Sequence, residues 1–195
     1  VEIPKRTPLV DRSYGSRLTT LEKRLKKAVA KSLVRNMAER SGIFKMMPRI
    51  RKFFGFASSF ADNRPRVFLH GDLYLGNVIL TKGGKAVLID FQGPAIGDPT
   101  FDFGNIFVDV SWRGYYNEFG KVFLAEYLRH HDYPELAELF NIRMVERDIT
   151  SIFSEFRDAA SHLPQKKAAL QRYFAHKRLE WRVKLIKQDL NQFGI

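Results

Sequence analysis

The sequence predicts an α+β fold that is mostly helical and carries small β-hairpins in its middle third. Apolar residues recur at helical spacing over residues 21–37. Three short runs rich in β-branched and aromatic residues, at 66–69, 77–80 and 86–91, are typical of strands. Helical patterns return after residue 99 and cover most of the remaining chain.

The first helix has predictable ends. Thr19 and Glu22 form a capping-box pattern, in which each side chain accepts a hydrogen bond from the other residue's backbone N–H, so the helix is expected to begin there. Ser41-Gly42 predicts its end, and the residues before Thr19 are expected to be irregular. Pro48 interrupts the apolar and basic stretch 43–60, which predicts a short helix followed by a second one.

The predicted strands in the middle of the chain frame a set of polar residues. The first strand leads into His70-Gly71-Asp72, and Asn77 begins the second. Lys82–Lys85 supplies a hairpin turn, and the returning strand carries Asp90 near its end. After Gly97-Asp98-Pro99, helices are predicted over roughly 100–111, 114–131, 135–161 and 165–192.

Composition limits the class of protein. With 45% apolar residues and 17 Phe in 195 residues, the chain can bury a substantial core as one domain. It contains no Cys, which excludes disulfides and thiolate metal sites and is compatible with a cytoplasmic location. No apolar run approaches the roughly 20 residues that span a bilayer.

Charge is distributed unevenly along the chain. The net charge is +12, of which residues 1–60 carry +11, residues 61–163 carry −5 and residues 164–195 carry +6. Solvated helix faces explain basic flanks of this kind. An anionic substrate, an anionic membrane surface or nucleic acid would also fit them.

Asp72, Asn77 and Asp90 are expected to lie in one cleft, because the loop and the hairpin between them are short. Phosphoryl transfer needs one carboxylate near the attacking hydroxyl. It also needs oxygen ligands that hold magnesium against the nucleotide phosphates. Two carboxylates and one amide within 19 residues meet both needs.

The same residues resemble those of a known family. His70-Gly71-Asp72 with Asn77 is similar to the catalytic loop of aminoglycoside phosphotransferases, choline kinases and related small-molecule kinases. Ile89-Asp90-Phe91 resembles the metal-binding segment that corresponds to DFG in protein kinases. Gly97-Asp98-Pro99 followed by Asp102 matches the run into the next helix. The resemblance implies the C-terminal lobe of a protein-kinase-like fold.

The resemblance also implies a role for each residue. Asp72 would accept the proton of the substrate hydroxyl or orient that hydroxyl, while Asn77 and Asp90 would bind magnesium. The implied cofactors are Mg²⁺ and ATP or GTP. A helix cap is the alternative role for Asp98, because Pro99 suits a first helical position. Structural support of the catalytic loop is implied for three residues: His70, Asp98 and Asp102.

Two departures from protein kinases indicate a small acceptor. Gly71 stands where protein kinases usually have the Arg that pairs with an activation-loop phosphate. Only seven residues separate Asp90 from Asp98, too few for a segment that docks a peptide. The acceptor implied is a hydroxyl of a sugar, an amino alcohol, a lipid-linked saccharide or an antibiotic.

A nucleotide-binding lobe is not recognisable in the 69 residues before His70, which contain no Gly-rich loop and no strand Lys pattern. We therefore expect residues 1–195 to be one kinase-like C-terminal lobe, with the nucleotide lobe supplied by missing upstream residues. Alone, such a chain should be inactive. The expected parts are a helical lead-in and insertion (1–65), a catalytic and metal-binding core (66–110) and a helical subdomain (111–195).

The basic flanks bear on the acceptor and on other partners. They would repel polycationic aminoglycosides and favour a neutral or anionic acceptor. Phe residues interleave with the cations of 45–60, so peripheral contact with an anionic membrane is a second expectation. A non-catalytic module of the same fold stays an alternative. A nucleic-acid-binding protein is a further alternative, but no motif supports it, and no nucleic acid is expected as a partner. The candidate contacts for the acceptor or another anion are Lys45, Arg49, Arg178 and Arg182.

Overall fold

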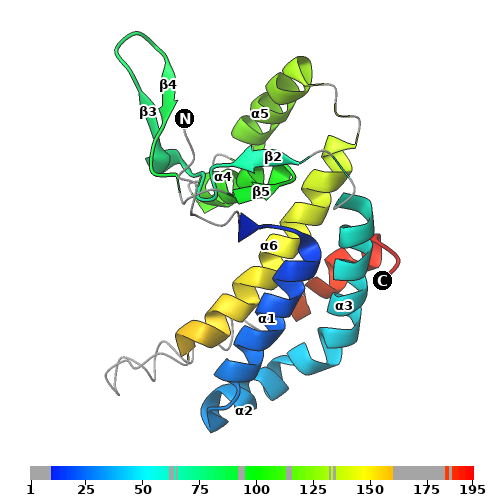
Figure 1. Cartoon of the computed structure of the whole chain (residues 1–195). Coiled ribbons are helices and arrows are strands. Elements are labelled where there is room, and N and C mark those ends of the chain that lie inside the picture. The colour runs from blue at the N-terminus through cyan, green and yellow to red at the C-terminus, as the bar shows by residue number, and fades with distance from the viewer. Residues whose placement is uncertain are drawn as a thin grey trace. The chain divides into compact units, whose positions relative to one another are not determined.

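The chain folds into two compact units, each assembled from two separate segments (Figure 1). The first unit contains Val1–Arg12 and Ala61–Arg143, and the second contains Ser13–Phe60 and Met144–Ile195. The computed structural model describes residues 10–61, 64, 66–91, 95–112, 116–131, 133, 135–159, 183–184 and 186–195.

The second unit is helical in its described residues. Helices α1 (Tyr14–Ala28), α2 (Ser32–Ser41) and α3 (Ile43–Ala61) follow one another along the chain. The long helix α6 (Leu136–Ala159) enters this unit at Met144. An aromatic cluster forms part of the core, where the ring of Phe53 meets those of Phe54 and Phe193 edge-on, each with centroids 5.7 Å apart.

Helix α1 begins earlier than the capping-box pattern predicted. Ser13 is the N-cap, and its Oγ accepts a hydrogen bond from the N–H of Ser16 at 3.4 Å. Thr19 instead lies inside the helix, where its Oγ1 donates to the carbonyl of Gly15. The prediction was wrong because Tyr14 belongs to the buried stripe that continues at Leu21. Burying this ring extends the helix toward the N-terminus.

The predicted first helix is in fact two helices. Continuing the buried stripe of α1 beyond Ala28 would place Lys31 and Ser32 in the core, and both are exposed. The chain turns there instead, and the side chain of Arg35 donates to the carbonyl of Val29 at 3.3 Å. This bond satisfies one of the carbonyls left without a helical partner at the end of α1.

Helix α3 corrects a second expectation, because it continues through Pro48 as one helix. Proline lacks an N–H, so the carbonyl of Phe44 loses its helical donor. Phe44 is 39% exposed and Pro48 is also exposed, so water can bond that carbonyl. The predicted stop before α3 is confirmed, since Gly42 ends α2 with a left-handed φ of 78°.

The first unit contains a small three-stranded sheet that the sequence revealed only in part. Strand β5 (Ala95–Gly97) lies in its centre, parallel to β1 (Val10–Asp11) and antiparallel to β2 (Val67–Leu69). Only β2 was predicted, because β1 and β5 are too short to show a period of two. Leu69, Ala95 and Phe101 form a buried cluster beside this sheet.

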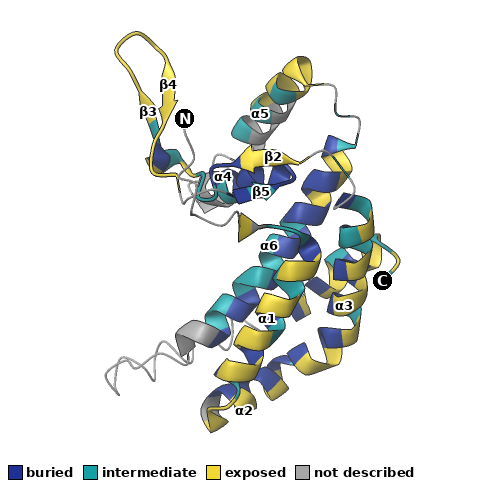
Figure 2. Ribbon diagram, in the orientation of Figure 1, coloured by how far each residue is buried: buried dark blue, intermediate teal, exposed yellow. Residues whose placement is uncertain are grey.

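The predicted hairpin is confirmed. Strands β3 (Val78–Leu80) and β4 (Ala86–Leu88) pair in antiparallel register, with Ile79 opposite Val87. The turn is closed by the N–H of Thr81 donating to Lys85 at 2.9 Å, and Gly84 supplies a φ of 75°. All residues from Thr81 to Phe91 are exposed, so the ribbon carries apolar side chains in solvent (Figure 2).

Helices complete the first unit. Helices α4 (Thr100–Trp112) and α5 (Tyr116–His130) and the start of α6 agree with three of the predicted helices. Aromatic contacts join them, with 4.5 Å between the centroids of Phe107 and Phe140 and 4.7 Å between those of Phe103 and Tyr127. The fourth predicted helix, 165–192, lies largely outside the described residues. Within the described ranges, no helix is long and apolar enough to cross a membrane.

The start of α1 provides a direct test of the fold. Ser13→Ala removes the N-cap oxygen and should lower the free energy of unfolding by about 1 kcal/mol. Thr19→Ala should have little effect or a small stabilising one, because Thr19 is an exposed position inside the helix and Ala has the higher helix propensity. Urea unfolding of both variants decides between the two helix starts. If only Thr19→Ala destabilised the protein, the helix would begin at Thr19, as the capping-box pattern predicts.

Candidate active site

One carboxylate anchors the predicted catalytic loop, residues 70–77, which is called the catalytic loop below. Asp102 lies in the first turn of α4, and its two oxygens accept the backbone N–H groups of His70 at 2.7 Å and Gly71 at 2.9 Å. Gly71 has a φ of 85°, a conformation that suits glycine and turns both N–H groups toward one acceptor. Burial raises the pKa of the Asp102 carboxyl above its ordinary value, although the N–H groups of His70 and Gly71 act to lower it.

His70 joins the catalytic loop to the segment around Asp90. The ring is buried, and its Nε2 lies 2.8 Å from the carbonyl of Ile89. A carbonyl only accepts, so Nε2 carries the proton, and Nδ1 can accept the N–H of Asp72 at 3.4 Å. The ring also stacks on Phe91, with 4.3 Å between centroids. His70 therefore holds the residues on both sides of Asp90.

Asn77 closes the loop around Asp72. Its side-chain Nδ2 donates to the carbonyl of Asp72 at 2.9 Å, which leaves Oδ1 as the acceptor end of the amide. The backbone of Asp72 is thus held at its N–H by His70 and at its carbonyl by Asn77. No hydrogen bond within the described part of the chain engages the Asp72 carboxylate, so this carboxylate can meet a substrate.

Asp90 has a strained backbone and an exposed side chain. Its φ of 58° makes it the non-glycine residue with a left-handed conformation among those described. Such residues cluster at functional sites, where the surrounding contacts hold the strain. The preceding residue donates its N–H to the carbonyl of Asn77 at 3.0 Å, so Asp90 directly follows a residue paired with Asn77. The structure therefore brings the two predicted metal ligands into neighbouring positions.

This pair of oxygen ligands fits magnesium better than a metal enclosed by protein. Mg²⁺ usually keeps several waters and takes one or two carboxylates together with substrate phosphates. Asp90 offers an exposed carboxylate and Asn77 the free end of a buried amide. In the described ranges, no three His, Cys, Asp or Glu side chains converge on one point. The residues fit an ion whose remaining ligands come from a nucleotide and from water.

Asp98 caps the next helix, the alternative that the sequence left open for it. Its Oδ1 accepts the N–H and the hydroxyl of Thr100, the first residue of α4. Its Oδ2 accepts Nη2 of Arg143 at 2.9 Å, in a pair whose side chains are 4% and 0% exposed. The guanidinium of Arg143 also lies over the ring of Phe101, 4.9 Å from its centroid.

Sequence reasoning missed Arg143 and the contact between Tyr74 and Gly76. An Arg within a helical pattern reads as an exposed cation, so nothing in the sequence marked Arg143 as fully buried. In the catalytic loop, a Cβ added at Gly76 would lie 2.4 Å from Cε2 of Tyr74, so a substitution there would displace the exposed Tyr74 ring. In the same loop, the left-handed φ of 85° at Gly71 favours glycine.

Of the four candidate anion contacts, the structure describes two, Lys45 and Arg49. Lys45 is exposed, and Arg49 donates to the carbonyl of Ile195 at 2.9 Å and to Oδ1 of Asn191 at 2.7 Å. Both belong to the second unit, whereas the catalytic loop belongs to the first. Arg178 and Arg182 lie outside the described residues. A role of these four in acceptor binding stays a prediction.

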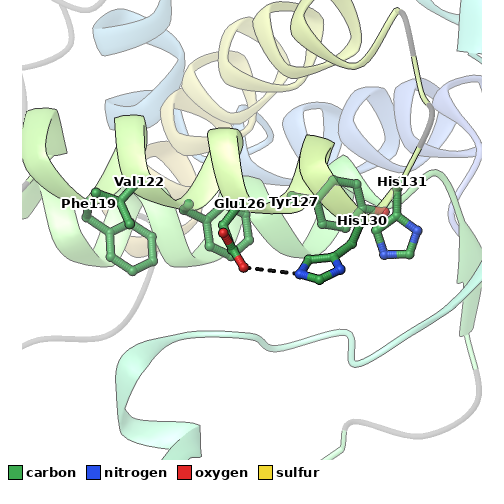
Figure 3. A pocket seen from close by; sticks show the side chains of 7 residues that line it. Phe119, Val122, Glu126, Tyr127, His130 and His131 are labelled. Atoms are coloured by element: carbon green, nitrogen blue, oxygen red, sulfur yellow. Dashed lines mark hydrogen bonds and ion pairs between the residues drawn. The ribbon is translucent and has the colours of Figure 1, made fainter.

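A shallow groove lies on α5, apart from the residues predicted for catalysis (Figure 3). It has a volume of about 460 Å³. At one end, His130 Nε2 lies 3.1 Å from Oε1 of Glu126, whose pKa is lowered first by Arg129 and then by His130. Its lining is mostly apolar: Phe119, Val122, Phe123, Glu126, Tyr127, His130 and His131.

Comparison with known proteins agrees with this geometry. A model described as the Phosphotransferase enzyme family (APH) matches residues 5–139, more than half of the chain. The chain belongs to the phosphotransferase enzyme family. Among curated proteins and among solved structures, nothing matches it. The match contains every residue of the catalytic loop, the hairpin and the start of α4. The mostly helical structure with two small sheets is compatible with the protein-kinase-like fold of phosphotransferases.

The left-handed backbone of Asp90 gives a prediction that does not depend on catalysis. Asp90→Ala should be less stable than Asp90→Gly by about 1 kcal/mol. The Cβ of Ala is strained in the left-handed conformation, whereas Gly has no Cβ and adopts this conformation without strain. Both variants lose the same carboxylate, so each is the control for the other. Chemical denaturation measures the difference. Equal stabilities would show that residue 90 is not left-handed in solution.

Proposed function

We propose that the chain is the C-terminal lobe of an ATP- and magnesium-dependent phosphotransferase that acts on a hydroxyl of a small molecule. One observation carries the proposal. The backbone of Asp72 is held on both sides, by the His70 ring and the Asn77 amide, while its carboxylate has no partner in the described part of the structure. A fixed backbone with a free carboxylate is what a base that positions a substrate hydroxyl requires.

Each residue of the loop then has a task. Asp72 orients the acceptor hydroxyl and accepts its proton as the oxygen attacks the terminal phosphorus of the nucleotide; the bond from that phosphorus to the bridging oxygen breaks, and the nucleoside diphosphate leaves. Asn77 and Asp90 hold Mg²⁺, which when bound would neutralise charge on the nucleotide phosphates. His70 keeps Asp72 and Asp90 in a fixed relation, because its ring contacts the backbone of one and both neighbours of the other.

The nucleotide itself needs more than these residues. Between Val10 and Leu69 the described residues form three helices and two short strands, without a Gly-rich loop that could cradle phosphates. The proposal therefore includes a nucleotide-binding lobe contributed by residues outside this sequence. Without it, ATP would bind in no fixed orientation, and in-line transfer would lose its effective molarity.

The acceptor is proposed to be small and either neutral or anionic, such as a sugar or a lipid-linked saccharide. Seven residues join Asp90 to Asp98, which leaves no segment on which a peptide could dock. Cations outnumber acids by eleven over residues 1–60, which disfavours a polycationic aminoglycoside.

The test is made on the protein expressed with its native upstream residues. Asp72→Asn keeps the size of the side chain but removes the base, so turnover should fall by about 100-fold or more while Mg-ATP affinity changes little. Asp90→Gly is the matched variant: it should lower Mg-ATP affinity, measured by calorimetry, because it removes one hard oxygen ligand and one negative charge. Acceptors to assay are sugars, amino alcohols and aminoglycosides.

Three results would contradict the proposal. Near-normal turnover of Asp72→Asn under conditions limited by chemistry would remove Asp72 as the base. Equal Mg-ATP affinity of wild type and Asp90→Gly would remove the metal role. Acceptor-dependent turnover by residues 1–195 alone, abolished by Asp72→Asn, would place a nucleotide site within this chain. If the protein with its upstream residues bound an acceptor but never turned it over, a non-catalytic module would be favoured.

A further inference from the structure

The first segment of the second unit concentrates positive charge. Residues 13–60 contain twelve Lys and Arg but only two Glu, a net charge of +10. One of the acids, Glu22, forms an ion pair with Arg51 at 2.7 Å. The other, Glu39, is on α2. Most of the cations in this segment therefore have no acid available within it.

Four of these cations share the exposed side of α1 near its C-terminal end. At 100° per residue, Lys23, Lys26 and Lys27 fall on the side of the helix opposite the buried stripe of Leu21, Leu25 and Ala28, and Arg24 lies at the edge of that side. All four are exposed. Figure 2 shows exposed, yellow turns along α1. No described residue forms an ion pair or a hydrogen bond with any of these four side chains.

Local helix energetics do not account for this cluster. Lys26 and Lys27 lie in the last turn, where cations favour the negative end of the helix dipole. Lys23 and Arg24 lie a turn earlier, beyond the reach of that effect. Like charges three or four residues apart, as in Lys23 with Lys26 and Lys27, repel one another and destabilise a helix. An anionic partner would remove this repulsion.

We propose that the exposed face of α1, centred on Lys23, Arg24, Lys26 and Lys27, binds the surface of an anionic phospholipid bilayer. Anionic headgroups attract clustered Lys and Arg, and each cation near such a surface is worth about fivefold in partitioning. The N-terminal half of the same face carries Ser16, Thr19 and Thr20, whose hydroxyls donate to the helix backbone. The acid of α1, Glu22, lies at the edge of this face and is paired with Arg51.

A bilayer suits this face better than nucleic acid does. Binding to single strands uses exposed aromatic rings for stacking, and reading a duplex uses Arg, Asn or Gln on base edges. The exposed face of α1 has neither an aromatic ring nor an amide, and three of its four cations are Lys. In the described residues of the second unit, the exposed large apolar side chain is Phe44, at the start of α3. The apolar stripe of α1 is buried, so attraction would be electrostatic rather than by insertion.

The experiment measures vesicle cosedimentation of residues 1–195. Wild type should bind vesicles of phosphatidylcholine with phosphatidylserine, fail to bind phosphatidylcholine alone, and lose binding as salt rises. The quadruple variant Lys23→Gln, Arg24→Gln, Lys26→Gln, Lys27→Gln should partition at least about 100-fold more weakly. Gln has nearly the same helix propensity as Lys, and circular dichroism checks that the helices remain. The matched control replaces four other exposed lysines by Gln, removing the same charge: Lys82, Lys85, Lys184 and Lys187.

The outcomes separate the sources of attraction. Strong binding by the control and weak binding by the α1 variant supports the proposal. Equal loss in both variants shows that net charge alone is responsible and overturns it. Wild type that does not bind anionic vesicles, or that binds neutral ones equally, also overturns it. If a duplex oligonucleotide competes fully with the vesicles and binds more tightly at the same salt, the partner is nucleic acid and the bilayer is excluded.

Discussion

The candidate active site depends on two hydrogen bonds accepted by one buried carboxylate. Asp102 accepts the N–H groups of His70 and Gly71, which are consecutive in the chain. The position of the His70 ring and that of Asp72 depend on these two hydrogen bonds. With His70 fixed, its ring can reach the carbonyl of Ile89, and with Gly71 turned, Asp72 emerges with a free carboxylate. The cost is the burial of a charge, which raises the pKa of Asp102.

A second consequence is the control of Asp90 from two sides. His70 bonds the carbonyl of the residue before it and stacks on the ring of the residue after it. These contacts can hold Asp90 in a left-handed conformation, which Asp tolerates better than most non-glycine residues. The proposed base and the proposed metal ligand are thus positioned by one imidazole, so their geometry is set together.

Sequence reasoning predicted the parts of the site that depend on residues close together in the sequence. Asp72, Asn77 and Asp90 were predicted to lie close together because short strands and a turn lie between them, and the hairpin that pairs Asn77 with Ile89 is confirmed. Arg143 was not found, because its partner Asp98 is 45 residues away and burial of a cation leaves no periodic signal. The start of α1 was missed because Tyr14 lies seven residues before the next buried position, beyond the window in which the period was evident.

The measurement that tests the central claim most directly is amide hydrogen exchange of the catalytic loop. In the wild-type chain, the N–H groups of His70 and Gly71 should be protected, although they belong to no helix or strand. Asp102→Asn replaces one acceptor oxygen by an NH₂ group, so at least one of the two amides should lose protection while those of α4 retain theirs. Unchanged protection of His70 and Gly71 in that variant would contradict the account, because the loop would then be held by something other than Asp102.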